Sequence, residues 1–250
     1  MVEGNPNLWT PGIKLGVKPG SFYHKTECFG PVLGLMRAAD LDEAIRFVND
    51  SEFGLTSGLH SLDDREVARW RERIEVGNAY VNRVTTGAIV RRQPFGGWKR
   101  SAFGSGAKAG GPNYVISLGR WRDRTDDLTP AEALARSKAS YQQAWGEHFS
   151  QEHDPSQVLG ESNVFRYRPI RAMLVRADAT TPPHALRQVE MAAAICGVPL
   201  AISLPVNMEM PAGLGRGETV TTIEQESGAL ASRIQHFERL RHWERPLTNY

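Results

Sequence analysis

The chain has 250 residues, enough for one large domain or two small ones, and a formal net charge of +2, which excludes strong electrostatic recruitment of nucleic acid or an anionic membrane surface. No apolar run reaches the roughly 18 residues that a membrane span needs, and the N-terminus lacks the basic-then-apolar pattern of an export signal. The two cysteines, Cys28 and Cys196, do not make a disulfide framework, so we expect a reducing cytoplasm.

The first half of the chain alternates short apolar runs with amphipathic helices. A Gly- and Pro-rich N-terminal stretch has the composition of a loop, and residues 32–36 form an apolar run suited to a buried strand. Helices are predicted from a capping box that opens at Asp40 and, by apolar spacing, near residues 63–75. Residues 79–82 and 116–121 are predicted as further short strands.

The second half contains a polar helix and a β-α-β unit. Thr129, followed by Pro and then by Glu three positions on, is a strong helix start. Strand-like runs at residues 172–175 and 198–204 flank a helix that opens near residue 181, which predicts two parallel strands joined by a right-handed crossover. Apolar residues at helical spacing predict a last helix over residues 226–243.

Glycine is concentrated in the segment over residues 85–114. Glycine lets the backbone approach a ligand closely and adopt positive φ, and successive N–H groups in such turns form a concave anion site. The turn over residues 85–88, Thr-Thr-Gly-Ala, is therefore a candidate for binding a carboxylate through hydrogen bonds from its main-chain amides. The residues alone leave a second interpretation open, in which these glycines only build tight turns.

Few side chains are candidates for chemistry. Glu27 lies just before a Phe-Gly-Pro turn and an apolar run, where a carboxylate can accept two hydrogen bonds from a ribose diol; the alternative is a solvated surface Glu. Cys28 has no Lys or Arg immediately beside it, and Cys196 ends an alanine-rich helix, so neither is a convincing nucleophile. His148 and His153 are five positions apart with no Cys nearby, and we predict no metal site.

Three stretches resemble the C-terminal part of aldehyde dehydrogenases. They are FYHKTECFGPVLG, GLTSGLHSLDDREVARWRERIEVGNAYVNR and TTGAIVRRQPFGGWKRSAFGSGAKAGGPNY. The last is similar to the L-glutamate γ-semialdehyde (Δ1-pyrroline-5-carboxylate) dehydrogenases in particular, including the form fused in bifunctional proline utilization A proteins. The resemblance covers roughly residues 5–121.

The resemblance implies roles for individual residues. Glu27 matches the glutamate that hydrogen-bonds the nicotinamide ribose, and Phe29 matches the aromatic side chain packed beside it. Main-chain amides of the glycine-rich turn match the loop that receives the substrate's α-carboxylate, and an aromatic residue after it matches a wall of the aldehyde pocket. The implied substrate-binding residues are Thr86, Gly87, Ala88 and Phe95.

The implied fold is α/β and has three parts. Residues 1–121 resemble the C-terminal portion of the catalytic domain, residues 122–160 a helix and linker, and residues 161–250 part of the Rossmann-like C-terminal domain of long proline utilization A proteins. The role of that last domain in the family is structural.

The resemblance also implies what this sequence does not carry. In the family the cysteine nucleophile and the domain that holds NAD lie well upstream of the ribose-binding glutamate, and only 26 residues precede Glu27 here. We therefore expect a fragment that shares NAD and L-glutamate γ-semialdehyde with a missing N-terminal part, which a separate gene could encode, and a full-length homo-oligomer. The alternatives are a non-catalytic partner and a structural or oligomerisation module.

Overall fold

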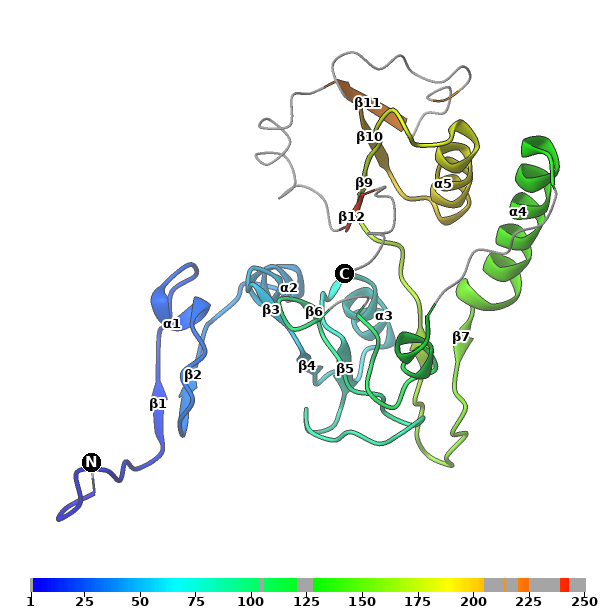
Figure 1. Cartoon of the computed structure of the whole chain (residues 1–250). Helices are drawn as coiled ribbons and strands as arrows, with labels where there is room; N and C mark the ends of the chain where they lie inside the picture. Colours follow the sequence, from blue (N-terminus) through cyan, green and yellow to red (C-terminus); the bar gives the residue numbers. More distant parts are fainter. Residues whose placement is uncertain are drawn as a thin grey trace. The chain divides into compact units, whose positions relative to one another are not determined.

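The computed structural model of the chain describes residues 2–103, 106–120, 128–204, 214, 220–224 and 239–242. The chain divides into two compact units (Figure 1): Met1–Arg122 with Pro155–Asn163, and Asp123–Asp154 with Val164–Tyr250. This division differs from the three parts expected from the sequence. The polar helix belongs to the second unit, whereas the short segment Pro155–Asn163 belongs to the first.

The first unit opens with a pair of parallel strands around a short helix. Strand β1 (Gly12–Lys14) pairs with β2 (Val32–Gly34), and α1 (Phe22–Lys25) lies between them in the chain. The N-terminal stretch that we predicted to be a loop therefore contains β1 and α1. Strand β2 is also not buried as predicted, because Val32 and Leu33 are 47% and 56% exposed on a sheet of two strands.

Two helices enclose the small apolar core of this unit. Helix α2 (Leu41–Asn49) begins as predicted at Asp40, whose side chain accepts from Glu43 N at 2.8 Å. Helix α3 (Asp64–Arg73) begins at Asp63, which caps it in the same manner. The buried core residues of this cluster are Ile45, Trp70, Ile74 and Val76.

Two pairs of short strands lie between and after these helices, and one strand lies within the glycine-rich segment. Strand β4 (Thr56–Leu59) runs parallel to β5 (Asn78–Val81), and β3 (Phe53–Gly54) is antiparallel to β6 (Trp98–Lys99). The strand predicted over residues 116–121 is wrong where the structure describes it, since Val115–Leu118 is a 3-10 helix, η1. Its turns are closed locally, with both the N–H and the hydroxyl of Ser117 donating to Tyr114 O.

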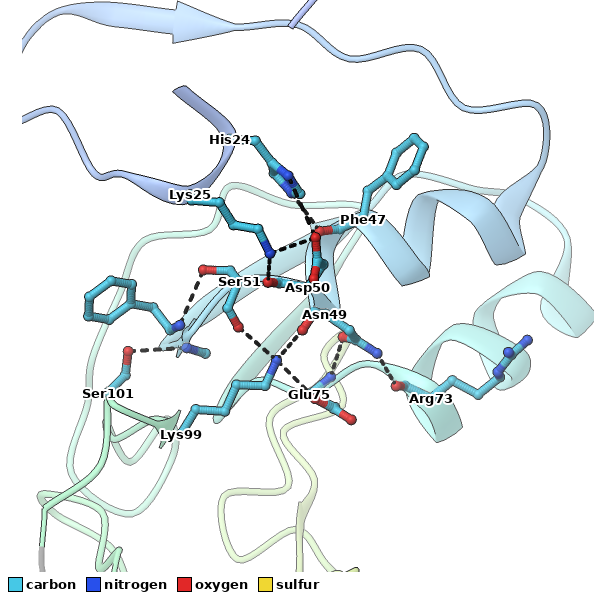
Figure 2. A network of polar contacts seen from close by, with 12 residues as sticks. His24, Lys25, Phe47, Asn49, Asp50, Ser51, Arg73, Glu75, Lys99 and Ser101 are labelled. Carbon is cyan, nitrogen blue, oxygen red and sulfur yellow. Dashed lines mark hydrogen bonds and ion pairs between the residues drawn. The ribbon is translucent and has the colours of Figure 1, made fainter. Parts of the chain in front are cut away.

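A polar network joins α1 to the end of α2 and to β6 (Figure 2). His24 Nε2 contacts Phe47 O at 2.9 Å, and Lys25 Nζ forms an ion pair of 2.6 Å with Asp50. Lys99 Nζ donates to Ser51 O at 3.1 Å and pairs with Glu75 at 2.9 Å. This network connects the segment that leads to Glu27 with the strand that follows the Pro-Phe-Gly-Gly turn.

The second unit begins with the predicted polar helix. Helix α4 (Pro130–Ala144) has a complete capping box between Thr129 and Glu132, and it continues into a π-helical turn, η2 (Trp145–Phe149). The short antiparallel strands β7 (Glu152–His153) and β8 (Phe165–Arg166) follow. They flank the Pro155–Asn163 segment, which belongs to the first unit.

A parallel sheet forms the core of the second unit. It contains β9 (Met173–Arg176), β10 (Leu200–Leu204), β11 (Val220–Glu224) and β12 (Arg239–His242) in the order β11-β10-β9-β12, with α5 (Pro183–Cys196) between β9 and β10 in the chain (Figure 1). The predicted β-α-β unit is confirmed. Its central strands are buried, as the near-continuous apolar run of β10 requires.

The helix predicted over residues 226–243 is wrong in its described part. Residues Arg239–His242 are a strand paired with β9, and the remainder of that prediction lies outside the described residues. Tertiary pairing with a buried parallel strand overrides the local helical spacing here. No helix among the described residues has the length and apolar character needed to cross a membrane.

Gly77 marks the closest approach of two backbone segments in the first unit. It immediately precedes β5, and a Cβ atom placed on it would lie 1.8 Å from Gly96 O and 2.6 Å from Gly97 Cα. Only glycine fits between the start of β5 and the Pro-Phe-Gly-Gly turn, because both obstacles are main-chain atoms.

The Gly77→Ala substitution should therefore destabilise the first unit by at least about 2 kcal/mol, the cost of forcing extra volume into a packed site. Urea unfolding followed by circular dichroism measures this. Gly12→Ala is the matched control, since a Cβ on Gly12 has no atom within 4 Å, and we expect it to change the free energy of unfolding by less than about 0.5 kcal/mol. Equal losses in the two variants would contradict this role for Gly77.

Candidate functional site

The predicted cofactor residues lie on the surface between α1 and β2. Glu27 is exposed, and its carboxylate makes no hydrogen bond or ion pair with any described residue. Phe29 is 95% exposed. Between them, Cys28 is an exposed free thiol whose sulfur lies 3.9 Å from Thr26 O. The Glu27 carboxylate and the Phe29 ring are thus both accessible to a ligand.

The predicted carboxylate anchor is an exposed turn over residues 86–88. Gly87 has a φ of +126°, a conformation that L side chains rarely adopt. Among the described residues, the N–H groups of Thr86, Gly87 and Ala88 have no hydrogen-bond acceptor. A turn with consecutive free amides is the backbone arrangement that binds anions. The chemistry expected of this turn is consistent with its geometry.

Two side chains from β5 and the turn after it hold the anchor turn. Tyr80 is 6% exposed, and its hydroxyl donates to Gly87 O at 2.8 Å. The guanidinium of Arg83 stacks over the Tyr80 ring at 5.2 Å and donates to Thr86 O at 3.4 Å. Arg83 also places positive charge beside the turn, which favours an anionic ligand there.

The chain after the anchor turn folds back on itself. Ile89 and Gln93 exchange backbone hydrogen bonds of 3.1 and 2.8 Å, and Phe95 is bridged to Ala109 by two bonds of 3.0 and 2.8 Å. Phe95 is half-buried, while Gln93 is only 8% exposed. The predicted pocket residue Phe95 is therefore fixed by the later part of the glycine-rich segment, only a short distance along the chain from the anchor turn.

The Lys108 side chain connects the glycine-rich segment to the start of β5 through hydrogen bonds. Its ammonium donates to Gly96 O and to Asn78 Oδ1, each at 3.0 Å, and to Gly77 O. Asn78, 9% exposed, also donates to Pro94 O at 3.0 Å. Burial lowers the pKa of Lys108 from 10.5 to about 8. The three oxygen acceptors offset part of the cost of burying this charge.

The Pro155–Asn163 segment reaches the same region. Arg92 pairs with Glu161, with its Nε donating at 3.1 Å, and Gln93 Nε2 lies 3.4 Å from Asn163 Oδ1. The hydrogen bonds from Arg92 and Asn163, with the positive charge of Arg83 nearby, hold the pKa of the Glu161 carboxyl below its usual range. A segment about 70 positions downstream thus contacts the residues that follow the anchor turn.

The other candidate side chains from the sequence, Cys196 among them, belong to the second unit. A cavity of about 370 Å³ in the second unit is lined mainly by apolar side chains from α4, α5 and η2, with Cys196 among them. Burial raises the pKa of the Cys196 thiol, as expected of a core cysteine. The part of the chain that the structure describes contains no group of three or more His, Cys, Asp or Glu side chains that could hold a metal ion.

Sequence reasoning missed several residues around the anchor turn. Lys108 and Gln93 lie inside a stretch that carried the resemblance, but their spacing gave no signal of their contacts. Glu161 and Asn163 lay at the start of the predicted Rossmann-like domain, and their partners are about 70 positions away. The residues that surround the predicted ones are Tyr80, Arg83, Gln93, Lys108, Glu161 and Asn163.

Comparison with known proteins relates the first unit to one enzyme family. Residues 2–118 match the model of the aldehyde dehydrogenase family. Residues 2–118 are therefore called the aldehyde dehydrogenase region below. The family's members are oxidoreductases, and both predicted site segments of this aldehyde dehydrogenase region fall inside the match.

The relatives of this aldehyde dehydrogenase region include enzymes with more specific names. The chain is 42% identical over 106 residues to the 1-pyrroline-5-carboxylate dehydrogenases of Geobacillus sp. (strain WCH70) and Bacillus subtilis (strain 168), covering 42% of this chain and 20% of each relative. A solved structure of proline utilization A from Corynebacterium freiburgense is 41% identical with a TM-score of 0.70, covering 87% of this chain and 25% of that one. The chain thus spans about a fifth of the curated relatives it matches.

The structural similarity to proline utilization A also includes residues of the second unit. The family match covers 117 of the 250 residues, whereas the likeness to proline utilization A covers 87% of the chain. It therefore extends beyond the aldehyde dehydrogenase region into the α/β unit that follows. The predicted resemblance to an aldehyde dehydrogenase of the proline utilization A type is confirmed.

The position of Lys108 makes the first unit sensitive to alkaline pH. Its pKa in the folded chain, about 8, is below the ordinary 10.5, so between these values the unfolded chain binds more protons. The free energy of unfolding should therefore rise with pH in that window, by at most about 1.4 kcal/mol per pH unit, and Lys108→Met should flatten the rise. Urea unfolding at several pH values measures this, and identical pH profiles for the two proteins would contradict it.

Proposed function

We propose that this chain is the C-terminal part of an NAD-dependent L-glutamate γ-semialdehyde dehydrogenase, which oxidises the semialdehyde to glutamate in proline catabolism. The single observation that carries the proposal is the anchor turn: its free amides at Thr86, Gly87 and Ala88, next to the Arg83 guanidinium, suit the α-carboxylate of an amino acid. Similarity to the 1-pyrroline-5-carboxylate dehydrogenases supports the same substrate.

The residues near α1 fit NAD as the cofactor. The unpaired carboxylate of Glu27 can accept hydrogen bonds from both hydroxyls of a ribose, and the exposed ring of Phe29 can pack against the sugar or the nicotinamide. NAD, when bound, accepts a hydride from the substrate. The contribution of this chain is to orient the cofactor's ribose and to hold the substrate's carboxylate.

The covalent step belongs to a residue other than the two cysteines of this chain. Cys28 is exposed beside Glu27, and Cys196 lines a cavity in the second unit with a raised pKa, which opposes thiolate formation. We infer that the nucleophile is contributed by polypeptide that completes the site, which a separately encoded half could supply. We expect the protein to work in the cytoplasm, where free thiols stay reduced.

Binding of L-glutamate, the proposed product, tests this function. Isothermal titration of the chain should detect binding, and Gly87→Ala should weaken it at least about tenfold, because alanine at a φ of +126° is strained and its Cβ would lie 2.9 Å from Gln93 Oε1. Gly12→Ala is the control and should bind normally. Glutamate binding that survives Gly87→Ala unchanged would remove the anchor turn from the proposal.

The same preparation should form no NADH from L-glutamate γ-semialdehyde by itself. Turnover that is lost in Cys28→Ala would show that this chain carries its own nucleophile, contrary to the proposal.

A further inference from the structure

One buried acceptor beside the anchor turn has no partner. Among the described residues, the only buried side-chain polar atoms without a hydrogen bond are Ser21 Oγ and Gln93 Oε1. Gln93 is 8% exposed, and its amide oxygen lies against Gly87, 2.9 Å from the position of a Cβ atom on that glycine. A buried carbonyl oxygen without a hydrogen-bond donor costs about 1–3 kcal/mol of folding free energy. Because this oxygen lies beside a candidate binding turn, a ligand is a natural source of the missing donor.

We propose that Gln93 recognises the α-ammonium group of the amino-acid substrate, an inference that rests on the proposed function of the turn. A carboxylate is acceptor-only and cannot hydrogen-bond an amide oxygen. The α-ammonium is a donor and is attached to the same carbon as the carboxylate. With the carboxylate on the free amides of Gly87 and Ala88, the ammonium is the neighbouring group that satisfies Gln93 Oε1.

The surroundings hold Gln93 in this orientation. Its backbone is locked to Ile89 by two hydrogen bonds, and its side-chain Nε2 lies 3.4 Å from Asn163 Oδ1. That amide contact directs the NH2 group toward the Pro155–Asn163 segment and leaves the oxygen facing Gly87. Arg83 Nη2 is 3.4 Å from the same Cβ position, so a cation and an acceptor both adjoin the turn. This pairing matches the opposite charges of an α-amino acid.

The proposal predicts a specific loss of selectivity. Glutarate is the same dicarboxylate as glutamate without the α-amino group. The unaltered chain should bind L-glutamate at least about tenfold more tightly than glutarate, because one ligand supplies a charged donor and the other leaves the amide oxygen unpaired. Gln93→Leu should remove this preference by weakening glutamate binding while leaving glutarate binding unchanged. Gln93→Glu should restore or increase the preference for glutamate.

Isothermal titration with both ligands makes the test. Tyr80→Phe is the matched control, since it removes the bond to Gly87 O and should weaken both ligands equally. Equal affinities in the unaltered chain, or equal losses for both ligands in Gln93→Leu, would overturn the role of Gln93 and leave the carboxylate anchor standing. Binding of neither ligand by the unaltered chain would overturn the proposed function together with this inference.

Discussion

The ammonium of Lys108 joins three parts of the first unit at one point. It is bound by the carbonyls of Gly77 and Gly96 and by the side chain of Asn78, so the start of β5 and the Pro-Phe-Gly-Gly turn share one cation. The glycines at 77 and 96 let these backbones come close enough for a single side chain to span them. Burying a charge for this purpose is costly, which is why its acceptors must all be in place. The segment that carries Gln93 and Phe95 depends on this junction for its position.

The site that results is made mostly of backbone. Free amides at the anchor turn, the Tyr80 hydroxyl behind it and the Gln93 carbonyl beside it define donors and acceptors without any titrating catalytic group. Under the proposed function, such an arrangement would recognise the charged end of an amino acid and leave the chemistry to other residues. The Pro155–Asn163 segment belongs to the same unit, and its Glu161 and Asn163 contact Arg92 and Gln93.

Sequence patterns correctly predicted those elements whose stability depends on residues close together in the chain. The caps at Asp40 and Thr129 and the β-α-β unit around α5 are confirmed because hydrogen bonds within a few residues, or a long apolar pattern, determine them. Residues 116–118 and 239–242 were assigned wrongly because a local apolar pattern fits several conformations, and contacts with distant residues decide among them. For the site, glycine content pointed to the anchor turn, but the roles of Lys108, Gln93 and Glu161 depend on contacts with partners far along the chain, which spacing cannot reveal.

The central claim is that the turn at residues 86–88 binds the α-carboxylate of glutamate through its main-chain amides. Titration of ¹⁵N-labelled chain with L-glutamate, followed by amide chemical shifts, tests it most directly. We predict that the Gly87 and Ala88 amide protons move downfield and saturate with a single affinity, while the amide of Gly12 in β1 stays in place. Saturable binding that leaves the Gly87 and Ala88 amides unmoved would contradict the account.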